Sequence, residues 1–210
     1  YVAIVMAFLY APILVLIVFS FNKSKSRGAW TGFTLSWYQR LFTNEAIIQS
    51  LINTLVVALI SSVLATVIGT LAAIGIRNMG RLSRSVVMNV TYMPVINPEI
   101  VTGVSLMLLF VFVKNAGVQL EFGFVTLVLA HITFNIPYVI LNVMPKLRQM
   151  DVSVYEAAQD LGCSPMQAFF KVVIPEIMPG MLAGFLMAVT YSLDDFIISY
   201  FVTGPTSQTL

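Results

Sequence analysis

Charged side chains are scarce in this sequence. Lys, Arg, Asp and Glu make up 10% of its 210 residues, whereas about 25% is typical of a soluble domain. Hydrophobic residues make up 59%, and the mean hydropathy is +0.92. The net charge of +2 is small, and the basic residues form no patch interleaved with aromatic ones. The composition therefore excludes an ordinary soluble domain and a nucleic-acid partner, and it predicts a protein surrounded by membrane lipid.

Residues typical of catalytic or metal-binding sites are also few. Cys163 is the only cysteine, which excludes a disulfide framework and a cysteine-based metal site. His131 is the only histidine and lies in a different, apolar segment, which argues against a catalytic thiol. The sequence contains neither a G-x-x-x-x-G-K-[ST] phosphate loop nor a G-x-S-x-G nucleophile turn. We therefore expect no enzyme, no metal site and no cofactor on this chain.

Long apolar runs dominate instead. Roughly 20 apolar residues, at about 1.5 Å each, cross the hydrocarbon layer as a helix, and helices satisfy their own backbone there. We therefore expect an all-α membrane protein, with residues 1–210 forming a single transmembrane domain. The five expected spans are Tyr1–Phe21, Leu51–Ile76, Ser85–Val113, Phe122–Pro145 and a last one opening with Ile177–Leu193.

The third of these segments is interrupted. Glu99 divides Ser85–Val113 into two charge-free halves of 14 residues each, and Pro94 and Pro98 come just before it. Neither half alone crosses the bilayer, so the sequence predicts one interrupted span or a bent pair. Irregular backbone at that depth requires protein or water around it, so we expect the break to face a translocation path.

The segment Asn22–Gln49 is polar and rich in Trp and Tyr. It contains Trp30, Trp37 and Tyr38 together with Lys23, Lys25, Arg27 and Arg40. Because Trp and Tyr favour the headgroup layer, part of this segment is expected to lie along the membrane surface. A simple linker is the alternative.

The longest polar interruption is Asp151–Pro175, DVSVYEAAQDLGCSPMQAFFKVVIP. Ser153 and Glu156 have the spacing of a capping box at the start of a short helix. Gly162 predicts the left-handed residue that follows the end of that helix.

A second short helix is expected directly afterwards. Ser164 and Gln167 repeat the capping box, and Pro165 suits the first helical position. Pro175 is expected to end this helix. The segment is thus predicted to be a compact helix–bend–helix.

Apolar side chains share one face of each predicted helix. They are Ala157, Ala158 and Leu161 on the first helix, and Met166, Phe169, Phe170 and Val173 on the second. Such faces are typical of a docking surface for another protein, or of an ordinary loop folded against its own membrane helices.

The motif in this segment resembles the EAA loop of ABC-importer permease subunits. The family pattern is E-A-A-x3-G-x9-I-x-L-P, and here it reads Glu156-Ala157-Ala158, Gly162, then Val172-x-Ile174-Pro175, with aliphatic exchanges at Val172 and Ile174. The resemblance implies a type I importer (MetI-like) fold, in which residues 151–175 form a cytoplasmic coupling helix that docks in a groove of an ATPase. The residues expected to make this contact are Glu156, Ala157, Ala158, Gly162, Met166, Phe169, Phe170 and Pro175.

The same resemblance sets the expected orientation. If successive loops lie on alternating sides of the membrane, six Lys and Arg residues fall on one side and five on the other. The positive-inside rule therefore does not decide the orientation of the chain. A cytoplasmic coupling loop implies that ATP and Mg are bound by a separate ATPase dimer. It also implies a sixth span after residue 210 and native residues before Tyr1.

Three carboxylates lie in or near the membrane: Glu99, Asp194 and Asp195. Counted along their helices from the cytoplasmic end, Glu99 lies at roughly 21 Å and Asp194 at roughly 26 Å. We expect the three to line an outward-facing entrance that attracts a cationic substrate. The alternative is that the aspartates cap a helix end and Glu99 pairs with a basic residue. His131 and Asn135 are expected to hydrogen-bond neighbouring helices.

A narrower resemblance concerns the substrate. Ser192-Leu193-Asp194-Asp195-Phe196 leading to Phe201-Val202-Thr203-Gly204-Pro205, and His131-Ile132-Thr133-Phe134, are similar to the PotC-type permeases of spermidine/putrescine importers. Polyamines are multiply protonated at neutral pH, which agrees with acidic residues along an entrance. Permeases for other small solutes share a similar Asp-Asp-Phe segment and remain an alternative.

The resemblance implies an alternating-access importer of the bacterial inner membrane. Its expected partners are an ATPase dimer, a homologous second permease, an extracytoplasmic substrate-binding protein and membrane lipid. An ion-coupled secondary transporter would use the three carboxylates as ion sites. A membrane scaffold would need none of them.

Overall fold

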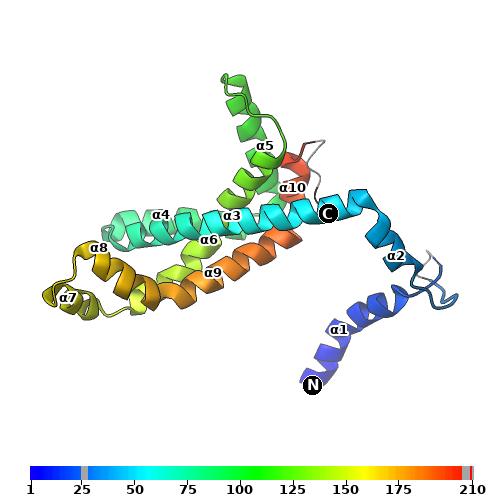
Figure 1. Ribbon diagram of the computed structural model, residues 1–210, viewed down its shortest axis with the longest axis horizontal. Coiled ribbons are helices and arrows are strands. Elements are labelled where there is room, and N and C mark those ends of the chain that lie inside the picture. Colours follow the sequence, from blue (N-terminus) through cyan, green and yellow to red (C-terminus); the bar gives the residue numbers. More distant parts are fainter. Residues whose placement is uncertain (25–27, 205–208, 210) are drawn as a thin grey trace. The chain divides into compact units, whose positions relative to one another are not determined.

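The computed structural model describes residues 1–24, 28–204 and 209. Lys25 and Arg27 of the expected external segment, and Pro205 of the expected terminal turn, lie outside the described residues. The helices, drawn in Figure 1, are α1 (Val2–Phe19), α2 (Ser36–Thr43), α3 (Glu45–Arg77), α4 (Arg81–Ile96), α5 (Glu99–Asn115), α6 (Phe124–Gln149), α7 (Val152–Asp160), α8 (Pro165–Ala168), the π-helix η1 (Phe169–Val173), α9 (Ile174–Asp194) and α10 (Ile197–Val202).

The predicted all-α membrane architecture is confirmed. Among the described residues, α1, α3, α6 and the continuous stretch Pro165–Asp194 are long and apolar enough to cross a membrane. The pair α4 and α5 meets the same criterion jointly and is bent by 108°. Counting this pair as one broken span gives the five spans that the sequence predicts.

Two compact units divide the chain, Tyr1–Gln49 and Ser50–Leu210. Helix α3 belongs to both, because its first residues lie in the first unit. A single domain over residues 1–210 stays a prediction.

In the first unit, the buried side chain of Asn22 organises the segment between α1 and α2. Its amide nitrogen donates to Ala29 O at 2.7 Å, and its amide oxygen accepts from Thr31 N at 2.9 Å. The indole of Trp37 donates to Asn22 O at 2.9 Å. These bonds give the segment a defined conformation, and its expected position along the membrane surface stays a prediction.

The break between α4 and α5 follows from Pro98. A residue before proline is driven to an extended backbone, and Asn97 has φ −73° and ψ 145°. Helix α4 therefore ends at Ile96, and α5 begins at Glu99 in a new direction. Helix α5 packs on α10. The two helices are close at Gly103 of α5, where an added Cβ atom would lie 3.0 Å from the Phe201 ring.

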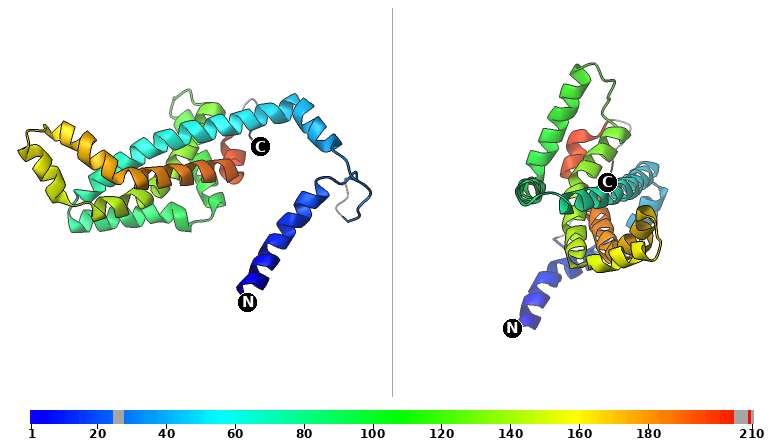
Figure 2. Two further views of the ribbon diagram at one scale, coloured as in Figure 1. Left: turned by 60° about the horizontal axis from the view of Figure 1, so that its bottom comes forward. Right: turned by 90° about the vertical axis from the view of Figure 1, so that its left-hand side faces the viewer.

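Helices α3, α6 and α9 lie side by side in the second unit (Figures 1 and 2). Glycines allow this close packing, because a Cβ atom at Gly69 of α3 would lie 2.8 Å from Val139 of α6. A Cβ atom at Gly184 of α9 would lie 3.1 Å from the Cα atom of the same Val139. Val139 is fully buried between the two backbones. In Figure 2, α7 and α8 lie at one end of this bundle and α10 at the other.

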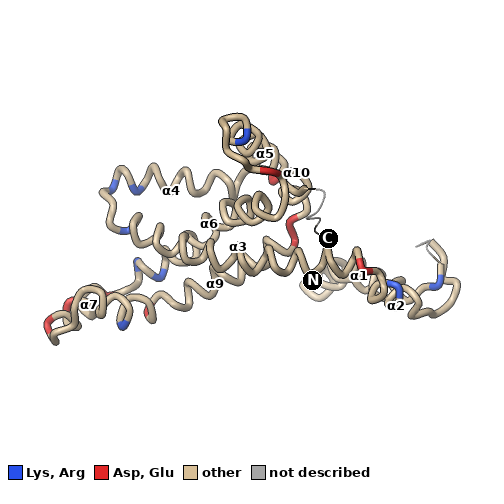
Figure 3. The backbone as a smooth tube through the Cα atoms, turned by 45° about the horizontal axis from the view of Figure 1, so that its top comes forward, with Lys and Arg blue, Asp and Glu red and all other residues tan. Residues whose placement is uncertain are grey.

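Charged residues of this unit gather at the two ends of the bundle, and the tube between them is almost free of charge (Figure 3). At the α7 end, the Arg84 side chain donates to the backbone oxygens of Ile76, Arg77 and Met79. It thereby satisfies carbonyl groups at the end of α3 that have no partner within the helix. The sequence did not predict this structural role for Arg84.

Two local predictions for residues 151–175 are wrong. The first short helix is capped by Asp151 and not by Ser153, because the Asp151 carboxylate accepts from Ser153 N at 2.9 Å. The second helix does not end at Pro175. It passes through the π-helical turn η1 into α9, where Pro175 lies in the first turn. Proline is tolerated there because the wider π turn loosens the backbone that its ring would otherwise hit.

Candidate functional site

Residues 151–175, expected to contact an ATPase and called the coupling segment below, form a turn-and-helix unit at one end of the bundle (Figure 2). The hydrogen bonds from Ser153 to the Asp151 carboxylate lower the pKa of that group, so the cap is charged at neutral pH. Gly162 has φ +89°, the left-handed conformation predicted for it. Ser164 and Gln167 form the predicted reciprocal capping box. These features fix the angle between α7 and α8.

Most of the predicted contact residues in this segment face away from the bundle. Glu156, Ala157, Gly162 and Pro175 are exposed, and Ala158 is half-buried. Leu161 is 87% exposed, a large value for an apolar side chain at a helix end. A loop folded entirely against its own membrane helices is therefore the wrong alternative.

The two large apolar side chains of the second helix that point outward are Met166 and Phe170, exposed by 66% and 61%. Phe169 differs, because it packs against the core cluster around Val143 and Leu147. Its ring also meets Phe170 edge to face, with centroids 5.3 Å apart. Phe169 thus supports the outward position of Phe170 from behind.

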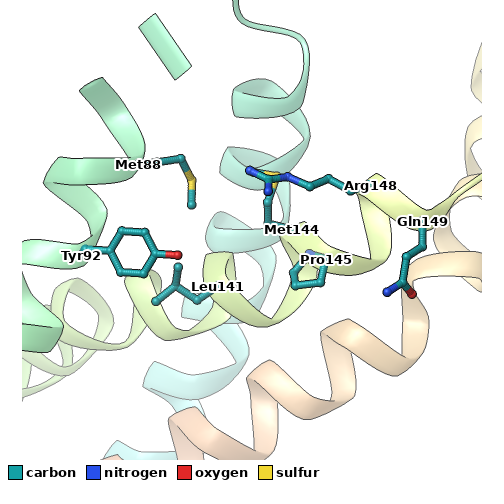
Figure 4. A pocket seen from close by; sticks show the side chains of 7 residues that line it. All are labelled: Met88, Tyr92, Leu141, Met144, Pro145, Arg148 and Gln149. Carbon is teal, nitrogen blue, oxygen red and sulfur yellow. The ribbon is translucent and has the colours of Figure 1, made fainter. Parts of the chain in front are cut away.

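A pocket of about 280 Å³ lies between α4 and α6, close to the same end of the bundle (Figure 4). Its walls are mainly Met and Leu side chains, with the polar groups of Tyr92, Arg148 and Gln149. Arg148 is the charged residue in this lining. A positive group repels an ammonium ion, so this pocket does not suit a cationic substrate.

Glu99 and Asp194 lie at the opposite end of the bundle, where α10 packs. Asp194 ends α9 just before α10, and Glu99 begins α5, which packs against α10 through Gly103. Both residues are exposed. The structure therefore places two of the three predicted carboxylates at the same end of the second unit.

Asp195 has internal partners instead. Its side chain is 2% exposed and accepts hydrogen bonds from Ile198 N at 3.1 Å and Ser199 N at 2.9 Å. The Ser199 hydroxyl donates to the same carboxylate. Asp195 thereby satisfies the first amide groups of α10 and connects this helix to α9.

His131 faces the same carboxylate. Its Nδ1 atom lies 2.9 Å from Leu127 O, and a carbonyl only accepts, so Nδ1 carries a proton. Its Nε2 atom lies 3.6 Å from Asp195 Oδ2. His131 thus contacts the end of α9, whereas its hydrogen bond is to Leu127 of its own helix, so the predicted hydrogen bond to a neighbouring helix stays a prediction. The corresponding prediction for Asn135 is wrong, because its buried amide has no hydrogen-bond partner among the described residues.

An aromatic cluster that sequence reasoning missed joins α6 and α9. The rings of Tyr138 and Tyr191 lie 4.3 Å apart, tilted by 33°. Phe134 meets both rings nearly edge-on, at 5.3 Å and 6.2 Å. Tyr138 and Tyr191 come from helices far apart in sequence, so no local pattern could have paired them.

Known transport proteins resemble this chain along nearly its whole length. The putrescine transport system permease protein PotI of Escherichia coli (strain K12) is 40% identical over 206 residues, which cover 97% of this chain and 73% of PotI. The spermidine/putrescine transport system permease protein PotC of Haemophilus influenzae is 37% identical over 207 residues, covering 99% of this chain and 79% of PotC.

A solved structure shares the fold. It is the crystal structure of a bacterial ABC transporter involved in the import of the acidic polysaccharide alginate, and it matches 98% of this chain and 76% of its own chain with a TM-score of 0.72. The sequence identity is 16%, so this likeness concerns the fold alone. The predicted fold of an ABC-importer permease is confirmed.

A family described as binding-protein-dependent transport system inner membrane component matches residues 65–210. That range holds the α4–α5 break, the coupling segment and the aromatic cluster. Together with the relatives it confirms the resemblance seen in the sequence and a multi-pass location in the inner membrane. The chain therefore belongs to the family of binding-protein-dependent transport system inner membrane components.

Proposed function

We propose that this chain is one permease subunit of an ATP-driven importer for polyamines such as putrescine and spermidine. The observation that supports the substrate class most directly is the 40% identity, over 97% of the chain, to a putrescine permease. A second permease subunit encloses the other half of the path, and a substrate-binding protein delivers the polyamine from outside. ATP and Mg are held by a separate ATPase dimer.

The coupling segment connects the permease to that ATPase. Its outward residues lie on a short rigid unit, and the α8–η1 part is continuous with the membrane helix α9. A push on Met166 or Phe170 is therefore transmitted directly to α9. When the ATPase dimer closes on ATP, this movement converts the inward-open bundle to the outward-open one.

The substrate enters at the opposite end. Glu99 and Asp194 are exposed there and carry the negative charge that attracts a cation. Asp195 supports α10 from inside and is not a substrate contact in this proposal.

Reconstitution tests the coupling. The chain is purified with its second permease, ATPase and binding protein, and ATP hydrolysis is measured with and without putrescine. We expect putrescine to stimulate hydrolysis in the wild type. Glu156→Lys should abolish this stimulation while leaving the thermal stability of the permease unchanged, because Glu156 is exposed. Glu121→Lys reverses an equally exposed charge outside the coupling segment and serves as the control.

Uptake measurements test the entrance. Glu99→Gln and Asp194→Asn should each slow putrescine uptake, and Glu121→Gln should not. Putrescine uptake that persists without the ATPase would instead favour an ion-coupled transporter. Stimulation by another solute but not by any polyamine would assign the chain to a different substrate.

A further inference from the structure

The pocket of about 280 Å³ between α4 and α6 plays no part in the proposed function (Figure 4). Most of its lining is apolar and consists of Met88, Leu141, Met144 and Pro145. The two methionine side chains are buried and belong to the core cluster of the bundle. The pocket is therefore a fixed hollow between two packed helices.

Three polar side chains complete the lining, and each of them can donate hydrogen bonds. They are Tyr92 of α4 and Arg148 and Gln149 of α6. Figure 4 shows the Tyr92 hydroxyl pointing from α4 toward α6. Within the described part of the chain, none of the three side chains has a hydrogen-bond or ion-pair partner. The pocket thus offers several donors and a positive charge to a ligand, and its described lining contains no carboxylate.

The depth of these donors matches the headgroup layer of a membrane. Arg148 and Gln149 are the last two residues of α6, directly before the coupling segment. Leu141 lies eight residues before Gln149, about 12 Å along the helix axis toward the middle of the bundle. Arg side chains near the ends of membrane helices place their charge at the interface. The pocket therefore extends from the headgroup layer into the hydrocarbon layer.

Charge and apolar surface together select one class of ligand. A phosphate group is an anion that accepts hydrogen bonds, and a guanidinium binds it more strongly than it binds a neutral group. A soluble phosphate compound would leave the apolar wall exposed to water, whereas the acyl chain of a lipid covers that wall. Basic pockets between membrane helices on the cytoplasmic side are suited to anionic lipid headgroups.

We propose that this pocket binds an anionic phospholipid of the cytoplasmic leaflet. Arg148 and the Tyr92 hydroxyl hold the phosphate, Gln149 donates to the headgroup oxygens, and the apolar wall packs against the first part of an acyl chain. The bound lipid connects α4 to the last turn of α6. This inference goes beyond the proposed function and rests on it only for the side of the membrane on which the pocket lies.

Lipid binding to the purified complex of both permeases and the ATPase tests the site. The Kd for dioctanoyl phosphatidylglycerol is measured in a neutral detergent, without ATP or putrescine. Because a hydrogen bond to a charged group corresponds to a factor of about 10 or more in affinity, Arg148→Gln should raise the Kd at least about 10-fold.

Lys146→Gln is the matched control. It removes the same charge from an exposed residue two positions earlier in α6, and Lys146 is not part of the lining. Because an exposed charge contributes little, we expect this variant to raise the Kd by less than about 3-fold. Tyr92→Phe keeps the ring, removes one donor and should raise the Kd by about 2- to 10-fold. This variant gives a result even if Arg148→Gln fails to assemble.

Two further ligands separate the headgroup from the acyl chain. Dioctanoyl phosphatidylcholine has the same chains but no net charge, and it should bind the wild-type complex more weakly than phosphatidylglycerol. Glycerol 3-phosphate has the phosphate but no acyl chain. It should not displace phosphatidylglycerol at concentrations at which that lipid saturates the site.

The outcomes distinguish this proposal from the proposed function. Equal Kd values for Arg148→Gln and Lys146→Gln would overturn the lipid site. Displacement by glycerol 3-phosphate would also overturn it, because the pocket would then bind a soluble anion, and so would the absence of saturable binding, as expected if a partner subunit covers the pocket. If the lipid binds as expected but no polyamine stimulates ATP hydrolysis by the complete importer, the proposed function fails and the lipid site stands.

Discussion

Replacing Gly69 by Ala tests the close packing of α3 on α6. An added Cβ atom would lie 2.8 Å from both Cβ and Cγ1 of Val139. Carbon atoms in contact normally lie about 3.5–4.0 Å apart, so the helices must separate by roughly 1 Å or Val139 must move. Val139 has no free space for this, because it is fully buried and Gly184 of α9 also packs closely against it.

The expected cost follows from this overlap. Overpacking a tight core by one methyl group costs about 1–3 kcal/mol. For a chain of this size, each kcal/mol lowers the melting temperature by about 2–4 °C. We therefore expect Gly69→Ala to melt about 2–12 °C below the wild type.

The measurement is thermal unfolding of the purified complex in detergent, and Gly75→Ala is the matched control. Gly75 lies on the same helix, but nothing lies within 4 Å of its added Cβ atom. Because Ala has a higher helix propensity than Gly, this control should be neutral or stabilising by up to about 1 kcal/mol. Equal melting temperatures for the two variants would refute the packing argument.

Three further predictions concern the two ends of the bundle. Gly162→Ala should strain the left-handed turn by about 1–2 kcal/mol, although its Cβ atom meets no neighbour, and putrescine-stimulated ATP hydrolysis should fall. Asp151→Ala should speed hydrogen exchange at the Ser153 amide. Because the pKa of Asp151 is lowered, the wild type should keep the slow exchange at neutral pH and lose it as the pH falls through that lowered value. Asp195→Ala should cost about 2 kcal/mol or more, since it leaves buried amides unpaired, whereas Asp194→Ala should leave the melting temperature unchanged.

Patterns along the chain predicted the spans well. Helix ends differ from the predicted ones by one to six residues, and the largest difference is at α3, which begins at Glu45 rather than Leu51. The break near Glu99 was predictable because Pro98 constrains the residue before it. The cap at Asp151 was not, because Asp151 and Ser153 both suit an N-cap and only the backbone decides between them.

The sequence by itself determined the membrane location, the broken span and the two-helix form of residues 151–175. These depend on apolar length, on proline and glycine backbone preferences and on a local motif, all of which act between residues close in the chain. The tertiary structure alone decided that Asp195 turns inward to α10 while Asp194 stays exposed, and that Tyr138 stacks on Tyr191. Contacts between α5, α6, α9 and α10 depend on how helices far apart in the sequence pack against one another. The spacing of residues within one segment does not predict such contacts.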